Sequence, residues 1–190
     1  MGTLSKIFIR TQDIEQILIE FEKYYTIRRR EILDDAKWWY YFENETIIIS
    51  QNYNVEWVEI EFDFQGNLLY LYDEFLRRLS ISMNSIILLG YYQSTTGVGR
   101  VAKFEVGKMD ISIVQLFITS KEKNAIYLVD NFGVSDDLKE MLHMDFSKIG
   151  DEFSLIDYNF IYNFFEKFGL KSDNHMASNS DKYLHIEKLK

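Results

Sequence analysis

The stretch of sequence that decides the fold runs from Val55 to Val106 and reads VEWVEIEFDFQGNLLYLYDEFLRRLSISMNSIILLGYYQSTTGVGRVAKFEV. Its first part alternates in character, with apolar Val58, Ile60, Phe62 and Phe64 on one parity and acidic Glu59, Glu61 and Asp63 on the other. Side chains alternate between the two faces of a strand, so this pattern predicts a half-buried strand with an acidic outer row.

A helix and two more strands follow within the same stretch. The apolar residues that recur at helical spacing predict a helix over 71–83; they are Phe75, Leu76, Leu79 and Met83. Residues 86–89 are apolar on both parities, which favours a central strand covered on both faces. Alternation resumes over 100–106, and Gly107 with Lys108 predicts a hairpin turn.

Three further helices are predicted outside this stretch, over 12–24, 136–143 and 157–168, because each segment carries an apolar stripe with helical spacing. The remaining apolar runs are short and suit strands. The predicted fold class is therefore α+β, a mainly antiparallel sheet with about four helices packed on it. Two small sheets, or a pseudo-repeat of strand, helix and strands, are alternatives. We expect one domain over 1–170, followed by a polar C-terminal tail over 171–190.

The composition is that of a globular chain of 190 residues, 47% hydrophobic and 16% aromatic. There is no cysteine, which excludes disulfides, thiolate metal sites and a cysteine nucleophile. The net charge of −9 disfavours nucleic acid and anionic membranes as partners and is compatible with a basic protein partner. We see neither a signal peptide nor an apolar run of about 18 residues, and so expect a cytoplasmic protein.

No pattern in the chain predicts a catalytic, metal or cofactor site. His143, His175 and His185 lie far apart and have no second ligand at a metal-binding spacing. The Gly97-Val98-Gly99 sequence lacks the rest of a dinucleotide-binding fingerprint. One enzymatic or ligand-binding alternative stays open. It would use the 55–63 carboxylates, which lie roughly 6.5–7 Å apart at alternate strand positions, or the 94–100 loop.

Aromatic residues supply a second kind of candidate site. The segment 37–43 holds five consecutive aromatic residues, and on a strand such a run faces both ways, with one set available for contacts. Together with the acidic row, these residues predict a surface that binds a partner. Its expected members are Glu59, Glu61, Asp63, Trp57, Trp39 and Tyr41.

Several features of the central stretch resemble a broad group of small, uncharacterised bacterial cytosolic proteins. They are Trp57 in the strand, Leu79-Ser80 in the helix, the apolar strand 86–89 and the strand 104–108 that runs into a Gly-Lys hairpin. Residues 11–15 fit the same group. Some of its members look like immunity proteins of polymorphic toxin systems, which implies a small acidic protein that binds and blocks a toxin.

We therefore favour a non-enzymatic protein-binding module, in its most specific form an immunity protein that neutralises a basic toxin domain. Charge complementarity would speed its association, and aromatic side chains would supply affinity. The alternatives are an enzyme or small-ligand-binding domain, as above, and a structural subunit whose aromatic surface forms a homodimer. No cofactor is expected in the favoured interpretation.

Overall fold

The computed structural model of the protein describes residues 3–24, 46–52, 56–62, 70, 72–118, 126–144, 155–170 and 180–187. The described strands are β1 (Thr3–Arg10), β2 (Thr46–Asn52), β3 (Trp57–Phe62), β4 (Ile86–Gln93), β5 (Val98–Glu105), β6 (Lys108–Ile118), β7 (Ile126–Phe132) and β8 (Ser180–Glu187). The described helices are α1 (Ile14–Glu22), α2 (Asp73–Ser82), α3 (Asp136–Met141) and α4 (Tyr158–Lys167).

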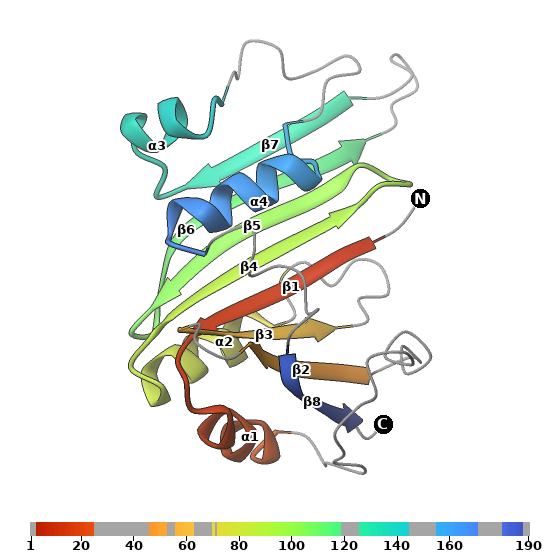
Figure 1. Ribbon diagram of the computed structural model, residues 1–190. Coiled ribbons are helices and arrows are strands. Elements are labelled where there is room, and N and C mark those ends of the chain that lie inside the picture. The colour runs from red at the N-terminus through yellow and green to blue at the C-terminus, as the bar shows by residue number, and fades with distance from the viewer. Residues whose placement is uncertain are drawn as a thin grey trace.

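The described strands form one sheet in the order β7-β6-β5-β4-β1-β3-β2-β8, and every neighbouring pair is antiparallel (Figure 1). The predicted α+β class is confirmed. The alternative of two small sheets is wrong, because β1 pairs with β3 on one side and with β4 on the other and so joins both halves of the chain.

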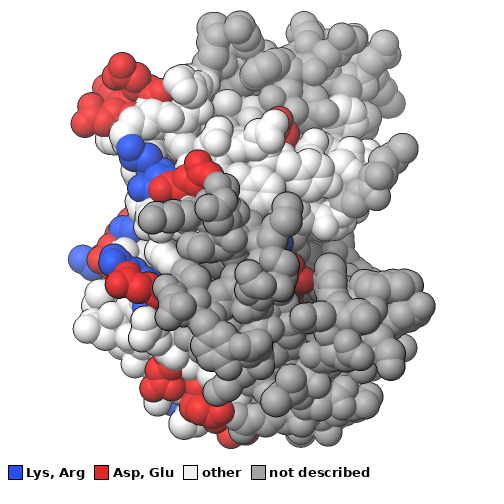
Figure 2. Space-filling view, viewed as in Figure 1, with Lys and Arg blue, Asp and Glu red and all other residues white. Residues whose placement is uncertain are grey.

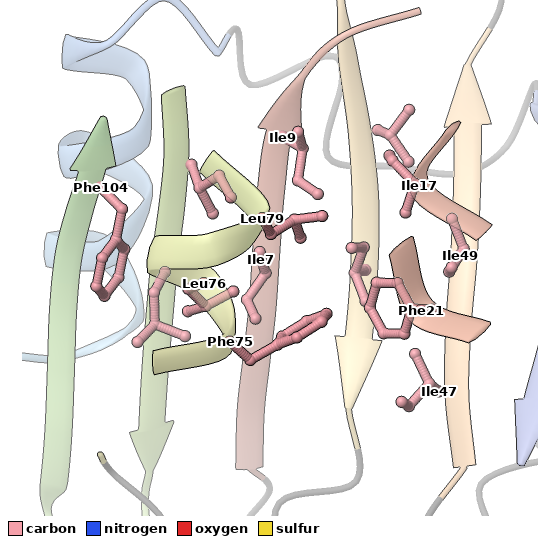
Figure 3. Packing of buried hydrophobic residues seen from close by; sticks show 14 of the residues in the cluster. Ile7, Ile9, Ile17, Phe21, Ile47, Ile49, Phe75, Leu76, Leu79 and Phe104 are labelled. Carbon is pink, nitrogen blue, oxygen red and sulfur yellow. The ribbon is translucent and has the colours of Figure 1, made fainter. Parts of the chain in front are cut away.

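One face of the sheet is covered by α1 and α2. Within one buried cluster, Ile17 and Phe21 of α1 lie over β2 and β3, whereas Leu76 and Leu79 of α2 lie over β1 beside Ile7 (Figure 3). These helices bury the stripe that their spacing predicted. All five side chains are almost inaccessible to solvent, and burial of each such side chain stabilises the fold by about 1.5–3 kcal/mol.

The opposite face is covered mainly by α4, with Leu138 and Leu142 from the α3 region extending the same cluster. Here the sheet carries glycine where the helix approaches most closely. A Cβ atom at Gly90 would lie 2.5 Å from both Ile161 and Phe165 of α4. The central strands are thus covered on both faces, as the doubly apolar run 86–89 predicted.

Three helices end in the same way, with a residue in the left-handed conformation that closes the last turn. These residues are Asn84 after α2, His143 after α3 and Gly169 after α4. Each also donates its own N–H to a carbonyl of the last turn, and the residue after it donates further back, from Ser85 to Ser80 in α2. This is the Schellman arrangement, and it accounts for the positive φ at each position.

Residues 180–187, which we expected to belong to a polar tail, form β8 at the edge of the sheet, paired with β2. The register places Leu184 opposite Ile49 and Ile186 opposite Ile47. This alternation of two apolar residues is short and follows a long polar segment, so it carries little signal by itself. The rest of the predicted tail, 171–179 and 188–190, lies outside the described residues.

Candidate functional site

The acidic row predicted on β3 faces the side of the sheet that α4 covers, and β1 supplies its counter-charge. Lys6 Nζ forms ion pairs with Glu59 and, at 3.0 Å, with Glu61. The strand register explains the contact, because Lys6 lies opposite Glu61 and Phe8 lies opposite Glu59. The two carboxylates are therefore neutralised in part by a cation that lies 53 residues from Glu59 in the sequence.

Burial distinguishes this group from a solvated acidic edge. Glu59 is only 7% exposed. Burial, together with the charge of Glu61, raises the pKa of Glu59 to about 7, although Lys6 acts in the opposite direction. Burial alone would lower the pKa of Lys6, but the two carboxylates raise it overall, so its ammonium group stays charged.

The other predicted partner-binding residues do not assemble into a described exposed surface. Trp57 is 6% exposed and belongs to the apolar cluster beneath α4. The prediction that Trp57 and Glu59 lie on an exposed surface is therefore wrong, because the face of β3 that carries them is covered and does not face solvent. Trp39, Tyr41 and Asp63 lie outside the described residues.

The 94–100 loop is a compact hairpin turn. Gly97 adopts a positive φ and donates its N–H to the Gln93 carbonyl at 2.8 Å. The buried side chain of Gln115 donates to the Gly97 carbonyl at 2.6 Å and accepts from the backbone N–H groups of Leu155 and Ile156. The turn is thus tied to the segment that leads into α4, which gives Gln115 a structural role.

Arg100, at the end of that predicted loop, belongs to a buried polar cluster that sequence reasoning missed. Its guanidinium group binds both carboxylate oxygens of Asp73, the first residue of α2, and lies 4.6 Å from the ring centre of Tyr70. Its Nε donates to Ser112 at 3.2 Å. The available signal was its parity, since Arg100 shares a strand face with the core residues Ala102 and Phe104.

An open cleft of about 790 Å³ lies at one end of the sheet, where β1 and β5 end and β3 and β4 begin. We call it the strand-end cleft. Its lining comes from four separate segments of the chain: Arg10, Thr11 and Gln12; Glu56; Asn84, Ser85 and Ile86; and Glu105 and Val106. Figure 2 shows charged side chains of both signs along the edge of the molecule where strand ends lie.

Hydrogen bonds hold the frame of this cleft. Ser85 Oγ donates to the Arg10 carbonyl at 2.5 Å, which joins the end of β1 to the turn after α2. Arg10 in turn donates from Nε and Nη2 to one oxygen of Glu56, at 3.1 and 2.9 Å. A buried hydrogen-bond network is thus not what holds Arg10 and Glu56 together, because both side chains are more than half exposed.

Val106 lies at the rim of the cleft in an unfavourable conformation. It has a φ of 46° and precedes Gly107 with a φ of 79°, so the two form a turn of type I′ between β5 and β6. A β-branched residue is rare at such a φ, where asparagine is preferred. Val106 is nevertheless 56% exposed, and exposed Ile81 lies over the adjacent Gly107. An aliphatic surface is thus held in solvent beside the cleft.

Other classes of site have little support in the described part of the chain. No group of three or more His, Asp or Glu residues there could hold a metal ion. Of the three histidines considered above, His143 occupies the helix-closing position after α3, and His185 lies in β8 opposite Ile48 of β2. Among the described helices, none has the length and apolar character required to cross a membrane.

The fold and the cleft together define an α+β protein built on one antiparallel sheet, with an open, charged cleft at one end of its strands. No protein-family model, curated protein or solved structure matches the chain.

Proposed function

We propose that the protein is a protein-binding module that contacts its partner through the strand-end cleft. The observation that carries this proposal is the strained and exposed conformation of Val106. A β-branched side chain at positive φ destabilises its own turn, and such positions cluster at functional sites. Here the strained residue also presents an apolar side chain to solvent at the rim of a cleft, where a partner would cover it.

The charges of the cleft agree with a basic partner. The lining of the cleft contains two acidic residues, Glu56 and Glu105, and one basic residue, Arg10. Nearby Lys103 forms ion pairs with both Glu105 and Asp110. The whole chain has a net charge of −9, which would favour the approach of a cationic surface. The specific form of this role implied by the sequence resemblance is an immunity protein that blocks a basic toxin domain.

A cross-linking experiment tests the proposed contact. Asn84 is replaced by a photo-reactive amino acid in the native cells, and Asp137 on α3, an exposed site outside the cleft, serves as the matched control. We expect one protein to be captured in stoichiometric amount from position 84 and not from position 137. The purified partner should then protect the amides of 84–86 and 105–107 from hydrogen exchange. Capture from both positions, or protection that spares these segments, would overturn the proposal.

A second candidate function, a small-ligand-binding domain or enzyme, is favoured by one observation. Glu59 combines burial, a cationic neighbour and a pKa near neutrality, which is the combination found in acid–base groups. Its test is a thermal-shift screen of metabolites against the protein and its Glu59→Gln variant. A compound that stabilises only the parent protein supports this function, and equal responses of both proteins remove it.

A further inference from the structure

The strand-end cleft has a definite spacing of charges across the sheet. Ile86 lies opposite Glu105, and the register that pairs Ile9 with Ile87 brings Arg10 level with Ile86. Glu56 comes directly before Trp57, which lies opposite Arg10. The order across β3, β1, β4 and β5 is therefore acid, Arg10, aliphatic, acid. Three strand spacings separate the two acids, a backbone distance of roughly 14 Å.

Each acid at the ends of this row has a carboxylate oxygen available. Both donors of Arg10 bind the same Glu56 oxygen, Oε2, and within the described part of the chain Oε1 of Glu56 has no hydrogen-bond partner. Glu105 uses Oε2 for Lys103, and its Oε1 is likewise without a partner among the described residues. The Arg10–Glu56 pair is 51% and 64% exposed. Such a pair contributes little to stability and is readily rearranged.

We infer that the cleft recognises an extended segment of its partner that carries two basic residues four positions apart with an apolar residue midway between them. Side chains at alternate positions of an extended chain share one face, and four residues span roughly 13–14 Å. The basic side chains would meet Glu56 and Glu105, and the central apolar side chain would lie between Arg10 and Ile86 and contact Ile86. Val106 at the rim would cover the stem of the second basic residue. This inference rests on the proposed function and specifies the chemistry of the partner.

Arg10 has a defined part in this recognition. In the free protein its guanidinium group forms an ion pair with Glu56, and a basic side chain of the partner would form the same ion pair in the complex. An incoming cation must share or displace this contact. Removal of Arg10 should therefore strengthen binding, whereas removal of an equivalent cation elsewhere should have little effect. Lys139 is that equivalent, since it forms an exposed ion pair with Asp136 on α3.

The probe for this test is the capped peptide acetyl-Arg-Ser-Leu-Ser-Arg-amide, titrated into isotope-labelled protein by NMR. Its first control replaces both arginines by citrulline, which has the same shape without the charge. Its second control shortens the spacing to two positions. We expect shifts of the Asn84, Ile86, Glu105 and Val106 amides, with a dissociation constant on the order of millimolar for so short a peptide. Neither control should reproduce those shifts at the same concentration.

Variants then assign the charges. Glu56→Gln and Glu105→Gln should each weaken peptide binding by about 2- to 5-fold, the range for an exposed ion pair. Arg10→Gln should strengthen it by a similar factor, and Lys139→Gln should leave it unchanged. Equal binding of the citrulline peptide, shifts outside the cleft, or weaker binding by Arg10→Gln would overturn the inference. If the peptide fails while the cross-link at position 84 captures a partner, the cleft remains the contact site and only this motif is wrong.

Discussion

Arg100 on β5 binds Asp73 at the start of α2 through two hydrogen bonds, from Nη1 to Oδ1 at 2.7 Å and from Nη2 to Oδ2 at 3.0 Å. The Arg100 side chain is completely buried, while 14% of the Asp73 side chain is exposed. The pair joins the first turn of a helix to the face of the sheet that the helix covers. Its loss would remove the Asp73 carboxylate from a fully buried guanidinium group.

Asp73→Ala should therefore destabilise the fold by about 3–5 kcal/mol, the cost of breaking a buried ion pair from one side. Urea unfolding followed by circular dichroism measures this change. The neighbouring Glu74→Ala is the matched control, because Glu74 pairs with Arg78 at 2.8 Å on the exposed face of the same helix. Its cost should stay below about 1 kcal/mol. Equal costs for the two variants would contradict a structural role for the buried pair.

A second prediction concerns the packing of α4 on the sheet. Gly90→Ala places a methyl group 2.5 Å from both Ile161 and Phe165, closer than carbon atoms can approach. The helix must move away, and we expect a loss of about 1–3 kcal/mol in the free energy of unfolding. The double variant with Phe165→Leu should recover part of that loss in the same measurement, since the smaller side chain makes room for the methyl group. No recovery would mean that the strain arises from the contact with Ile161, which the double variant leaves in place.

Local sequence patterns predict the helices of this fold but not the contacts between distant elements. The stripes containing Ile17 and Phe164 predicted α1 and α4 to within three residues at either end, because helical spacing is a local property. The partner of Arg100 is 27 residues away and that of Glu59 is 53 residues away. Both contacts depend on strand order and on which helix covers which face.

The sequence could not predict the strand-end cleft for the same reason. Its lining comes from four segments that only the sheet topology brings together. Acidic residues on β3 were correctly read as one strand face, but that face is enclosed, with Lys6 of β1 paired to them. The exposed aliphatic at the rim, Val106, could have been noticed as an unusual residue before Gly107 in a hairpin turn.

A third prediction follows from the raised pKa of Glu59. Its ordinary value is 4.5 and its value in the fold is about 7, so between these values the folded protein binds more protons than the unfolded chain. The contribution of Glu59 to the free energy of unfolding is therefore fully present below about pH 4.5 and is lost as the pH rises towards about 7. The slope of this loss is at most about 1.4 kcal/mol per pH unit. Lys6 stays charged throughout this range, because its pKa is raised.

Urea unfolding at a series of pH values tests this dependence. Glu59→Gln keeps an acceptor for Lys6 but cannot ionise, so the fall in stability between about pH 4.5 and about pH 7 should be reduced by the share of one proton. Glu56→Gln, which removes a carboxylate from an exposed ion pair, is the matched control variant. A slope that is the same in the parent protein and in Glu59→Gln would show that Glu59 titrates at its ordinary value.

The last prediction separates stability from binding at Val106. Asparagine adopts the left-handed conformation of a type I′ turn more easily than valine does, so Val106→Asn should relieve the strain at φ 46°. We expect the free energy of unfolding to rise by about 0.5–1 kcal/mol, measured by urea unfolding.

The same variant should bind the partner captured at the cleft more weakly, by about tenfold, because it replaces an exposed apolar contact with a polar amide. Isothermal titration of the purified pair measures this loss. Val106→Thr keeps the β-branch and the strain but replaces a methyl group with a hydroxyl group, so it should weaken binding without any gain in stability. A Val106→Asn protein that is more stable and binds equally well would show that the strained turn has no part in recognition, and the proposed contact site would then have to lie elsewhere.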